Sequence, residues 1–217
     1  MIARQITPKD YNLILELDKK VYPTSKPVTK EVIASWYIRN PEFGMIFCEN
    51  GKIEGVFVVI PLNKESWNRL INGNLKEAEM TDKTIFDNLK DKEIGIHIYH
   101  TEKFNQNIKD FYKYNFEELD KIIKILRSKN KNLKIFGISA YSVSPPGIGL
   151  RTKLDFKERS FISDEHILDK DKKLIVAEST KQAEDLKIKG YKYINRCQMK
   201  VLYPNEDSIV WNYLNKI

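Results

Sequence analysis

Prolines and glycines gather in the stretch Ser142–Glu158, and phosphate binding is the first chemistry to test there. A P-loop needs a lysine directly after its last glycine, and Gly149 is followed by leucine. A dinucleotide fingerprint needs a third glycine where this sequence has Thr152. We therefore interpret the stretch as a strand running into a short helix, with Pro145 or Pro146 in the first helical turn.

The histidines His97, His100 and His166 are candidates for metal binding or proton transfer. His97 and His100 lie three residues apart in an expected strand, so we expect their side chains on opposite faces. That arrangement does not suit a shared metal ion, and no metal site is expected. Imidazole titrates near neutral pH, so either residue could act as a general base.

Composition limits the classes of function. The net charge is +7, but positive and negative residues are mixed along the chain, so we do not expect nucleic acid as a partner. The lysine-rich segment with Phe111, Tyr112, Tyr114 and Phe116 could stack on bases, but we favour a lid that packs on the domain.

The cysteine count and the apolar pattern indicate in which cellular compartment the protein is expected. The two cysteines, Cys48 and Cys197, are far apart, which disfavours a disulfide framework or a zinc knuckle. The sequence has no apolar run of about 20 residues and no apolar segment near its start. We expect a protein without a membrane partner, located in the cytoplasm.

Periodicity and turn signals give the order of elements. A strand over 2–7 precedes a helix that starts at Thr7-Pro8, and Thr29 is the N-cap expected for a second helix. Asn50-Gly51 between apolar runs predicts a type I′ hairpin. Further strands are expected at 93–100, 133–141, 157–162 and 174–178, and helices at 115–126 and 181–189. The pattern predicts an α/β fold.

Three passages in this order resemble the GNAT superfamily of acyl-CoA-dependent N-acyltransferases: IARQITPKDYNLILELDKKVYP, FCENGKIEGVFVVIPL and SAYSVSPPGIGLRTKLDFKE. The resemblance implies a mixed central sheet whose fourth and fifth strands splay apart, with helices on both faces. It implies a domain over residues 1–178 with an insertion at about 64–92. Residues 179–217 are expected to form an extension packed on that domain.

The resemblance also implies a site for acetyl-CoA, as acyl donor, between the strands EIGIHIYH and LKIFGISAY. The cofactor-binding residues expected there are Ile98, Tyr99, His100, Lys103, Lys109, Ser144 and Arg151. Tyr141 is the candidate acid for the leaving thiolate, and His97, His100 or Glu79 is the candidate base for an incoming amine. The acceptor would be a small-molecule or peptide amine.

Two departures from the family pattern keep an alternative open. The segment 101–116, where the family has its pyrophosphate loop, contains no glycine. Arg151 stands where the family often has a tyrosine, and a guanidinium cannot act as the general acid. The chain is therefore expected to be an N-acetyltransferase, or else a catalytically degenerate GNAT-like module that binds or regulates.

Overall fold

The computed structural model describes residues 1–21, 27–168, 173–177, 179–204 and 207–214. The described strands are β1 (Ile2–Gln5), β2 (Gly44–Glu49), β3 (Lys52–Asn63), β4 (Glu93–Lys103), β5 (Lys134–Ser142), β6 (Lys157–Leu168), β7 (Lys173–Ala177) and β8 (Lys192–Leu202). The described α-helices are α1 (Tyr11–Val21), α2 (Lys30–Tyr37), α3 (Lys64–Ile71), α4 (Phe111–Lys129), α5 (Pro145–Lys153), α6 (Thr180–Ile188) and α7 (Ile209–Leu214). The 3-10 helices are η1 (Pro8–Asp10), η2 (Pro41–Phe43) and η3 (Glu77–Glu79).

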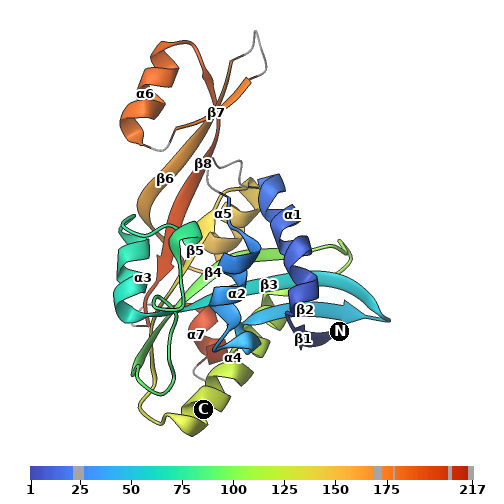
Figure 1. Cartoon of the computed structure of the whole chain (residues 1–217). Coiled ribbons are helices and arrows are strands. Elements are labelled where there is room, and N and C mark those ends of the chain that lie inside the picture. Colours follow the sequence, from blue (N-terminus) through green and yellow to red (C-terminus); the bar gives the residue numbers. More distant parts are fainter. Residues whose placement is uncertain (22–26, 169–172, 178, 205–206, 215–217) are drawn as a thin grey trace.

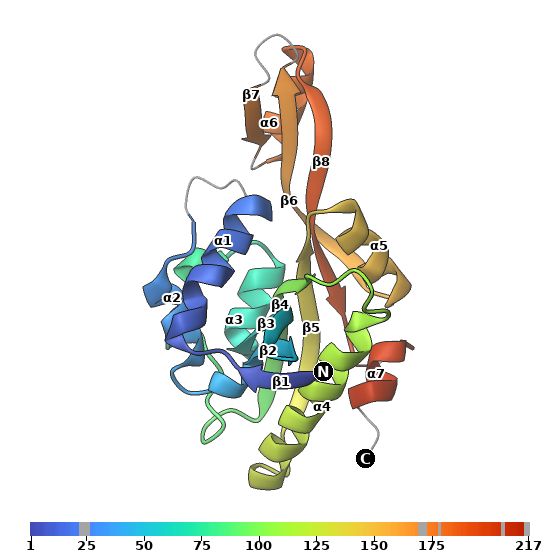
Figure 2. The same cartoon turned by 90° about the vertical axis from the view of Figure 1, so that its right-hand side faces the viewer.

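In the described part of the chain the strands form one eight-stranded sheet, in the order β1-β2-β3-β4-β5-β8-β6-β7. β4 and β5 are parallel, and every other neighbouring pair is antiparallel. Helices α1, α2 and α3 lie on one side of the sheet, and α4, α5 and α7 lie on the other (Figure 2). The expected mixed α/β sheet with helices on both faces is confirmed.

The hairpin between β2 and β3 forms where the sequence predicts it. Asn50 and Gly51 have φ angles of 50° and 78°, the two positive values that a type I′ turn requires. Glu49 pairs with Lys52 on either side of the turn. Thr29 is also confirmed as an N-cap, because its Oγ1 accepts a hydrogen bond from the amide of Val32.

Helix α4 begins earlier than the sequence indicates. The sequence predicts a start at Asn115, but the helix begins at Phe111, and Asn115 is buried inside it. Phe111, Tyr112 and Phe116 form part of its buried stripe. The burial of these rings against the sheet stabilises the additional first turn.

The C-terminal residues occupy a different place from the one expected. Residues 179–217 were expected to form an extension packed on a domain that ends at 178. Instead they supply β8, which lies between β5 and β6 and pairs antiparallel with both. This pairing covers the edge that β5 would otherwise expose, and it buries Met199 and Leu202 completely.

Two long strands extend beyond the rest of the sheet. β6 and β8 run together away from the other strands, and β7 and α6 lie at their far end (Figure 1). Among the described residues, none of the helices is both long and apolar enough to cross a membrane.

The expected insertion over 64–92 supplies α3 and η3, which lie over β4 and β5. Trp67 of α3 is fully buried and packs against the backbone of Gly95 in β4 and Gly137 in β5. These two glycines pair directly across the parallel strands. The contact secures the β4–β5 pairing just before the two strands part.

Candidate functional site

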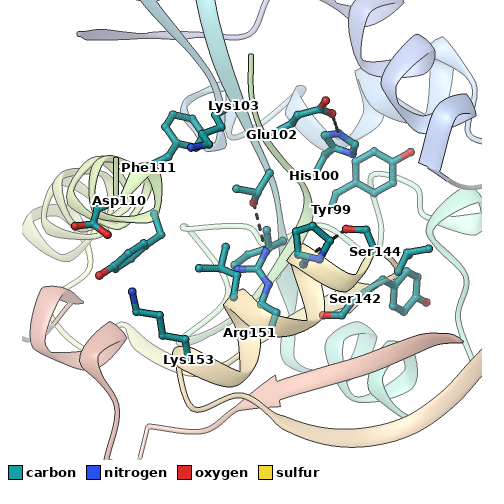
Figure 3. Close-up of a pocket in the computed structure, with 18 of the residues that line it drawn as sticks. Tyr99, His100, Glu102, Lys103, Asp110, Phe111, Ser142, Ser144, Arg151 and Lys153 are labelled. Carbon is teal, nitrogen blue, oxygen red and sulfur yellow. Dashed lines mark hydrogen bonds and ion pairs between the residues drawn. The ribbon is translucent and has the colours of Figure 1, made fainter. Parts of the chain in front are cut away.

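β4 and β5 diverge at their carboxyl ends. Their parallel pairing ends at Ile98 and Ala140, whereas β4 continues to Lys103 and β5 to Ser142. A pocket of about 590 Å³ lies between them, and the start of α4 and the length of α5 complete its walls (Figure 3). The expected splay of the fourth and fifth strands is therefore present.

A β-bulge shapes the wall that β4 contributes to the pocket. Val58 of β3 pairs with His100, and Val59 pairs with Ile98, so Tyr99 is an additional residue in β4. This extra residue turns His100 to the face that His97 also occupies, and the expectation of opposite faces was wrong. Tyr99 packs edge-on against Trp36 of α2, with ring centroids 4.8 Å apart.

The α5 side of the pocket carries its buried cation. The Arg151 side chain is buried, its Nη2 lies 3.4 Å from Thr101 Oγ1, and its guanidinium lies 5.4 Å from the centre of the Phe156 ring. Lys153, two residues further along α5, is exposed and lies over the ring of Tyr112 in α4 at 5.5 Å. The pocket therefore combines one buried positive charge with a more exposed one.

The hydroxyl of Ser144 caps the first turn of α5. It accepts a hydrogen bond from the amide of Gly147 at 3.2 Å, and Pro145 and Pro146 occupy the positions in which a proline costs the helix no hydrogen bond. The stretch around Ser142–Glu158 is thus a strand exit followed by a helix, as its sequence predicts.

The segment between β4 and α4 is folded by a lysine rather than by glycines. Lys103 Nζ donates to the carbonyl oxygens of Gln106 at 3.3 Å and Ile108 at 2.8 Å. The segment ends at Asp110, which has a positive φ of 50° and whose side chain caps none of the first amides of α4. Those amides carry the positive end of the helix dipole and face the pocket, whose lining includes Asp110, Phe111 and Tyr112.

Carboxylates also line this end of the pocket. Glu102 accepts a hydrogen bond from His100 Nε2 at 3.0 Å, and this bond lowers the pKa of Glu102. Asp110 pairs with Lys113 at 3.0 Å, and this pairing lowers the pKa of Asp110. Both carboxylates therefore stay ionised at neutral pH, and part of the positive potential in the pocket is offset.

A buried polar network lies beside the point where the strands part. The imidazole of His97 is fully buried, with Nε2 2.7 Å from Glu77 Oε1 and Nδ1 2.9 Å from Ser139 Oγ. Burial raises the pKa of Glu77 well above its usual value and lowers the pKa of His97 to about 3. A proton lies between Glu77 Oε1 and His97 Nε2 in this 2.7 Å hydrogen bond, and burial disfavours the charged form of both groups.

Tyr141 connects this network to the pocket. Its ring packs edge-on against His97 with centroids 5.2 Å apart, and it also lines the pocket. Burial is the main cause that raises the pKa of Tyr141 well above 10, and the nearby carboxyl of Glu77 adds to it. The phenol therefore stays protonated and can donate a proton.

Most of the expected cofactor-binding residues lie in the pocket, but not every expected site residue does. Six of the seven expected cofactor-binding residues line the pocket, and these are Ile98, Tyr99, His100, Lys103, Ser144 and Arg151. Lys109 is exposed and does not belong to the lining. Glu79 is also exposed, and its carboxylate accepts the amide of Lys76 at 3.0 Å at the start of η3.

Several site residues were missed from the sequence. Glu77 is the acidic residue of η3 that reaches His97, and its place two residues before Glu79 in a short acidic run was the only signal available. Ser142 and Thr101 line the pocket as well, and their positions at strand ends gave a weak signal.

Most of the aromatic rings in the lysine-rich segment are buried. Phe111, Tyr112 and Phe116 are buried and not available to stack on bases, and of these aromatics only Tyr114 is exposed. No group of three or more histidine, cysteine or acidic residues is arranged to hold a metal ion in the part of the chain that the structure describes.

Comparisons with known proteins identify structures with a similar fold. The sequence matches no protein-family model and no curated protein. Among solved structures, Naa20 of Chaetomium thermophilum in complex with a bisubstrate analogue aligns with a TM-score of 0.50 over 94% of this chain and 86% of that one, at 10% identity. The chain has the GNAT fold.

Two further GNAT structures align at slightly lower scores. Arabidopsis thaliana Naa50 in complex with CoA-Ac-MVNAL covers 93% of this chain and 97% of its own, with 11% identity and a TM-score of 0.49. The Drosophila melanogaster polyamine N-acetyltransferase covers 93% and 99%, with 11% identity and a TM-score of 0.46. At such low identity neither alignment bears on the activity of this chain.

Proposed function

We propose that this protein is an N-acetyltransferase that moves the acetyl group of acetyl-CoA to an amine by direct attack. The observation that carries the proposal is the pocket between β4 and β5, which combines the bulge at Tyr99, the start of α4 and the buried Arg151. GNAT structures with this fold have been obtained with acetyl-CoA or with CoA-containing bisubstrate analogues. Acetyl-CoA supplies the acetyl group in activated form, as a thioester.

The lining of the pocket fits such a donor. Arg151 and Lys153 provide positive charge, the first amides of α4 face the same space, and Ser144 and Thr101 add hydroxyl groups. Ile98, Tyr99 and His100 would lie along the acyl and pantetheine portion, and Lys103 near the phosphates. Lys109, outside the lining, would act on the phosphates only through its charge.

The Tyr141 network would manage the protons of the reaction. Tyr141 carries a proton at neutral pH and lines the pocket, so it is the proposed donor to the leaving sulfur. His97, whose pKa of about 3 prevents it from holding a proton at neutral pH, is the proposed relay that passes the amine proton to Glu77, its hydrogen-bond partner with a raised pKa. Glu79 would act by holding the start of η3 and so positioning Glu77.

A second candidate function rests on one specific observation. The segment between β4 and α4 has no glycine, and the carboxylates of Glu102 and Asp110 lie at the same end of the pocket. Both features oppose a pyrophosphate at that place. A GNAT-fold module that binds or regulates without transferring an acetyl group would have these properties.

Calorimetric titration with acetyl-CoA, followed by transfer of labelled acetyl groups to a panel of primary amines and peptides, separates the two functions. Binding with transfer to at least one amine supports the transferase, whereas binding without any transfer supports the module. Absence of binding at about 1 mM acetyl-CoA, an affinity weaker than about −4 kcal/mol, contradicts the transferase.

Matched variants show whether the binding occurs in this pocket. Leu150→Trp places an indole in the lining, and we expect it to abolish the heat of binding. Ile125→Trp adds the same ring at an exposed position of α4, outside the lining, and should bind as the wild type does. Equal binding by both variants would locate acetyl-CoA elsewhere.

A further inference from the structure

The pocket has a buried polar end formed by two residues. Ser142, the last residue of β5, is only 2% exposed, and its Oγ has no hydrogen-bond partner among the described residues. Arg151 is 6% exposed, and both residues line the pocket. Figure 3 shows Ser142, Ser144 and Arg151 on one side of the pocket, across from Glu102 and Lys103. A buried hydroxyl without a partner beside a buried cation indicates a place for an anionic ligand group.

This polar end lies near the point where the strands part. Arg151 Nη2 lies 3.4 Å from Thr101 Oγ1, and Thr101 is three residues beyond Ile98, where the pairing of β4 with β5 ends. Lys153 is exposed and Lys103 is half-buried, and both lie toward the α4 side. The cations thus differ in depth, with Arg151 the most deeply buried of them.

The depth of Arg151 decides which part of the ligand it meets. The phosphates of a coenzyme A molecule are multiply charged and stay near solvent, where the exposed lysines and the start of α4 lie. The thioester end is uncharged and narrow, and it is the end that can enter between the strands. Negative charge develops there first on the acetyl oxygen, as the amine attacks, and then on the sulfur, when the carbon–sulfur bond breaks; only the charge on sulfur is also present in free coenzyme A once its thiol has ionised.

We infer that Arg151 binds the sulfur of the departing coenzyme A as a thiolate, with the Ser142 hydroxyl as a second donor. The inference rests on the proposed acetyl transfer. In that step the amine nitrogen forms a bond to the acetyl carbon, and the carbon–sulfur bond breaks with its electron pair passing to sulfur. The amine proton leaves toward His97. The guanidinium then balances the charge on sulfur until a proton arrives from Tyr141 or from water.

A measurable binding property follows, even without a known acceptor. A positive charge within about 4–6 Å of an acid favours the ionised form by one to three pKa units. An ordinary thiol ionises near pH 8.5. Coenzyme A bound beside Arg151 should therefore ionise below that pH, and its affinity should rise about tenfold or more between pH 6 and pH 9.5.

S-methyl coenzyme A is the control ligand, because it has the same phosphates and no ionisable thiol. It meets the same titratable groups of the lining, which are Tyr99, His100, Glu102, Lys103, Asp110, Tyr112, Tyr141, Arg151 and Lys153. The ratio of the affinity for coenzyme A to the affinity for S-methyl coenzyme A therefore reports the ionisation of the thiol alone. The ratio is measured by calorimetry at several pH values for the wild type, Arg151→Gln, Arg151→Lys and the exposed control Arg159→Gln.

From pH 6 to pH 9.5 we expect the affinity for coenzyme A, relative to that for its S-methyl derivative, to rise about tenfold in the wild type and in Arg159→Gln. The rise should be smaller in Arg151→Lys and absent in Arg151→Gln. Parallel pH profiles of the two ligands in the wild type would overturn the inference and leave the proposed function intact. If Arg151→Gln lowered the affinity for both ligands equally at every pH, Arg151 would be assigned to a phosphate, and the inference would again be overturned. No binding of either ligand to the wild type at about 1 mM would remove the proposed function as well.

Discussion

The contact between Trp67 and the paired glycines of β4 and β5 gives a sharp test of the fold beneath the site. A methyl group at Gly95 would overlap the Cβ and Cγ atoms of Trp67, which are fixed to the α3 backbone. A methyl group at Gly137 would lie 2.5 Å from Cη2, at the far end of the ring. Overpacking a core costs typically about 1–3 kcal/mol. We therefore expect Gly95→Ala to lower the free energy of unfolding by about 3 kcal/mol, and Gly137→Ala by about 1–2 kcal/mol.

Urea unfolding followed by circular dichroism measures these differences. Gly149→Ala is the matched control, because its added methyl group meets nothing within 4 Å and lies in helix α5, where alanine should add about 0.5–1 kcal/mol. In a Trp67→Leu background the cost of Gly95→Ala should fall below about 1 kcal/mol, since the overlapping ring is gone. A Gly95→Ala protein as stable as Gly149→Ala would refute the described contact.

Three further outcomes are expected. Tyr141→Phe should lower the transfer rate by about 10²-fold with acetyl-CoA affinity unchanged, and an unchanged rate would exclude Tyr141 as the acid. Glu77→Gln should lower kcat by a similar factor, whereas Glu65→Gln, on the exposed side of α3, should not. The salt bridge with Arg4 is the main cause that lowers the pKa of Asp10 from 3.8 to about 2, and it contributes stability above pH 4 that is lost as the pH falls to 2. Because Arg4 is 42% exposed, Asp10→Asn should cost only about 1 kcal/mol at pH 7 and clearly less at pH 2, where about half of the Asp10 carboxyl is protonated, in urea unfolding at both pH values.

Features set by short-range chemistry could be predicted from the sequence. The Asn50-Gly51 turn, the Thr29 cap and the Ser144-Pro145 helix start each depend on residues within about four positions. The β4 strand was also recognised by its alternating isoleucines, and the β5 strand by its nearly continuous apolar run. The order of these elements carried the resemblance to the GNAT superfamily, and that resemblance implied the mixed sheet and the gap between its central strands.

Features that depend on distant partners could not be predicted. The bulge at Tyr99 arises from the register of β4 against β3, and alternation within β4 alone gives the wrong face for His100. The choice between Glu77 and Glu79 depends on how η3 lies over His97, and both residues look alike in sequence. The first turn of α4 exists because the sheet buries its aromatic rings, whereas its local sequence resembles a loop.

The position of β8 has a consequence for how the protein is made. β5 pairs with β4 on one side and with β8 on the other, and β8 lies about 50 residues later in the chain. A ribosome that has produced β1 through β5 therefore presents a sheet with an open edge, and β6 and β7 emerge before that edge is filled. The strand β5, which forms one wall of the pocket, is thus paired on its second edge late, by a segment with high contact order. Nascent chains halted before β8 should be bound by chaperones, and the capacity to bind a ligand should appear only after β8 has been added.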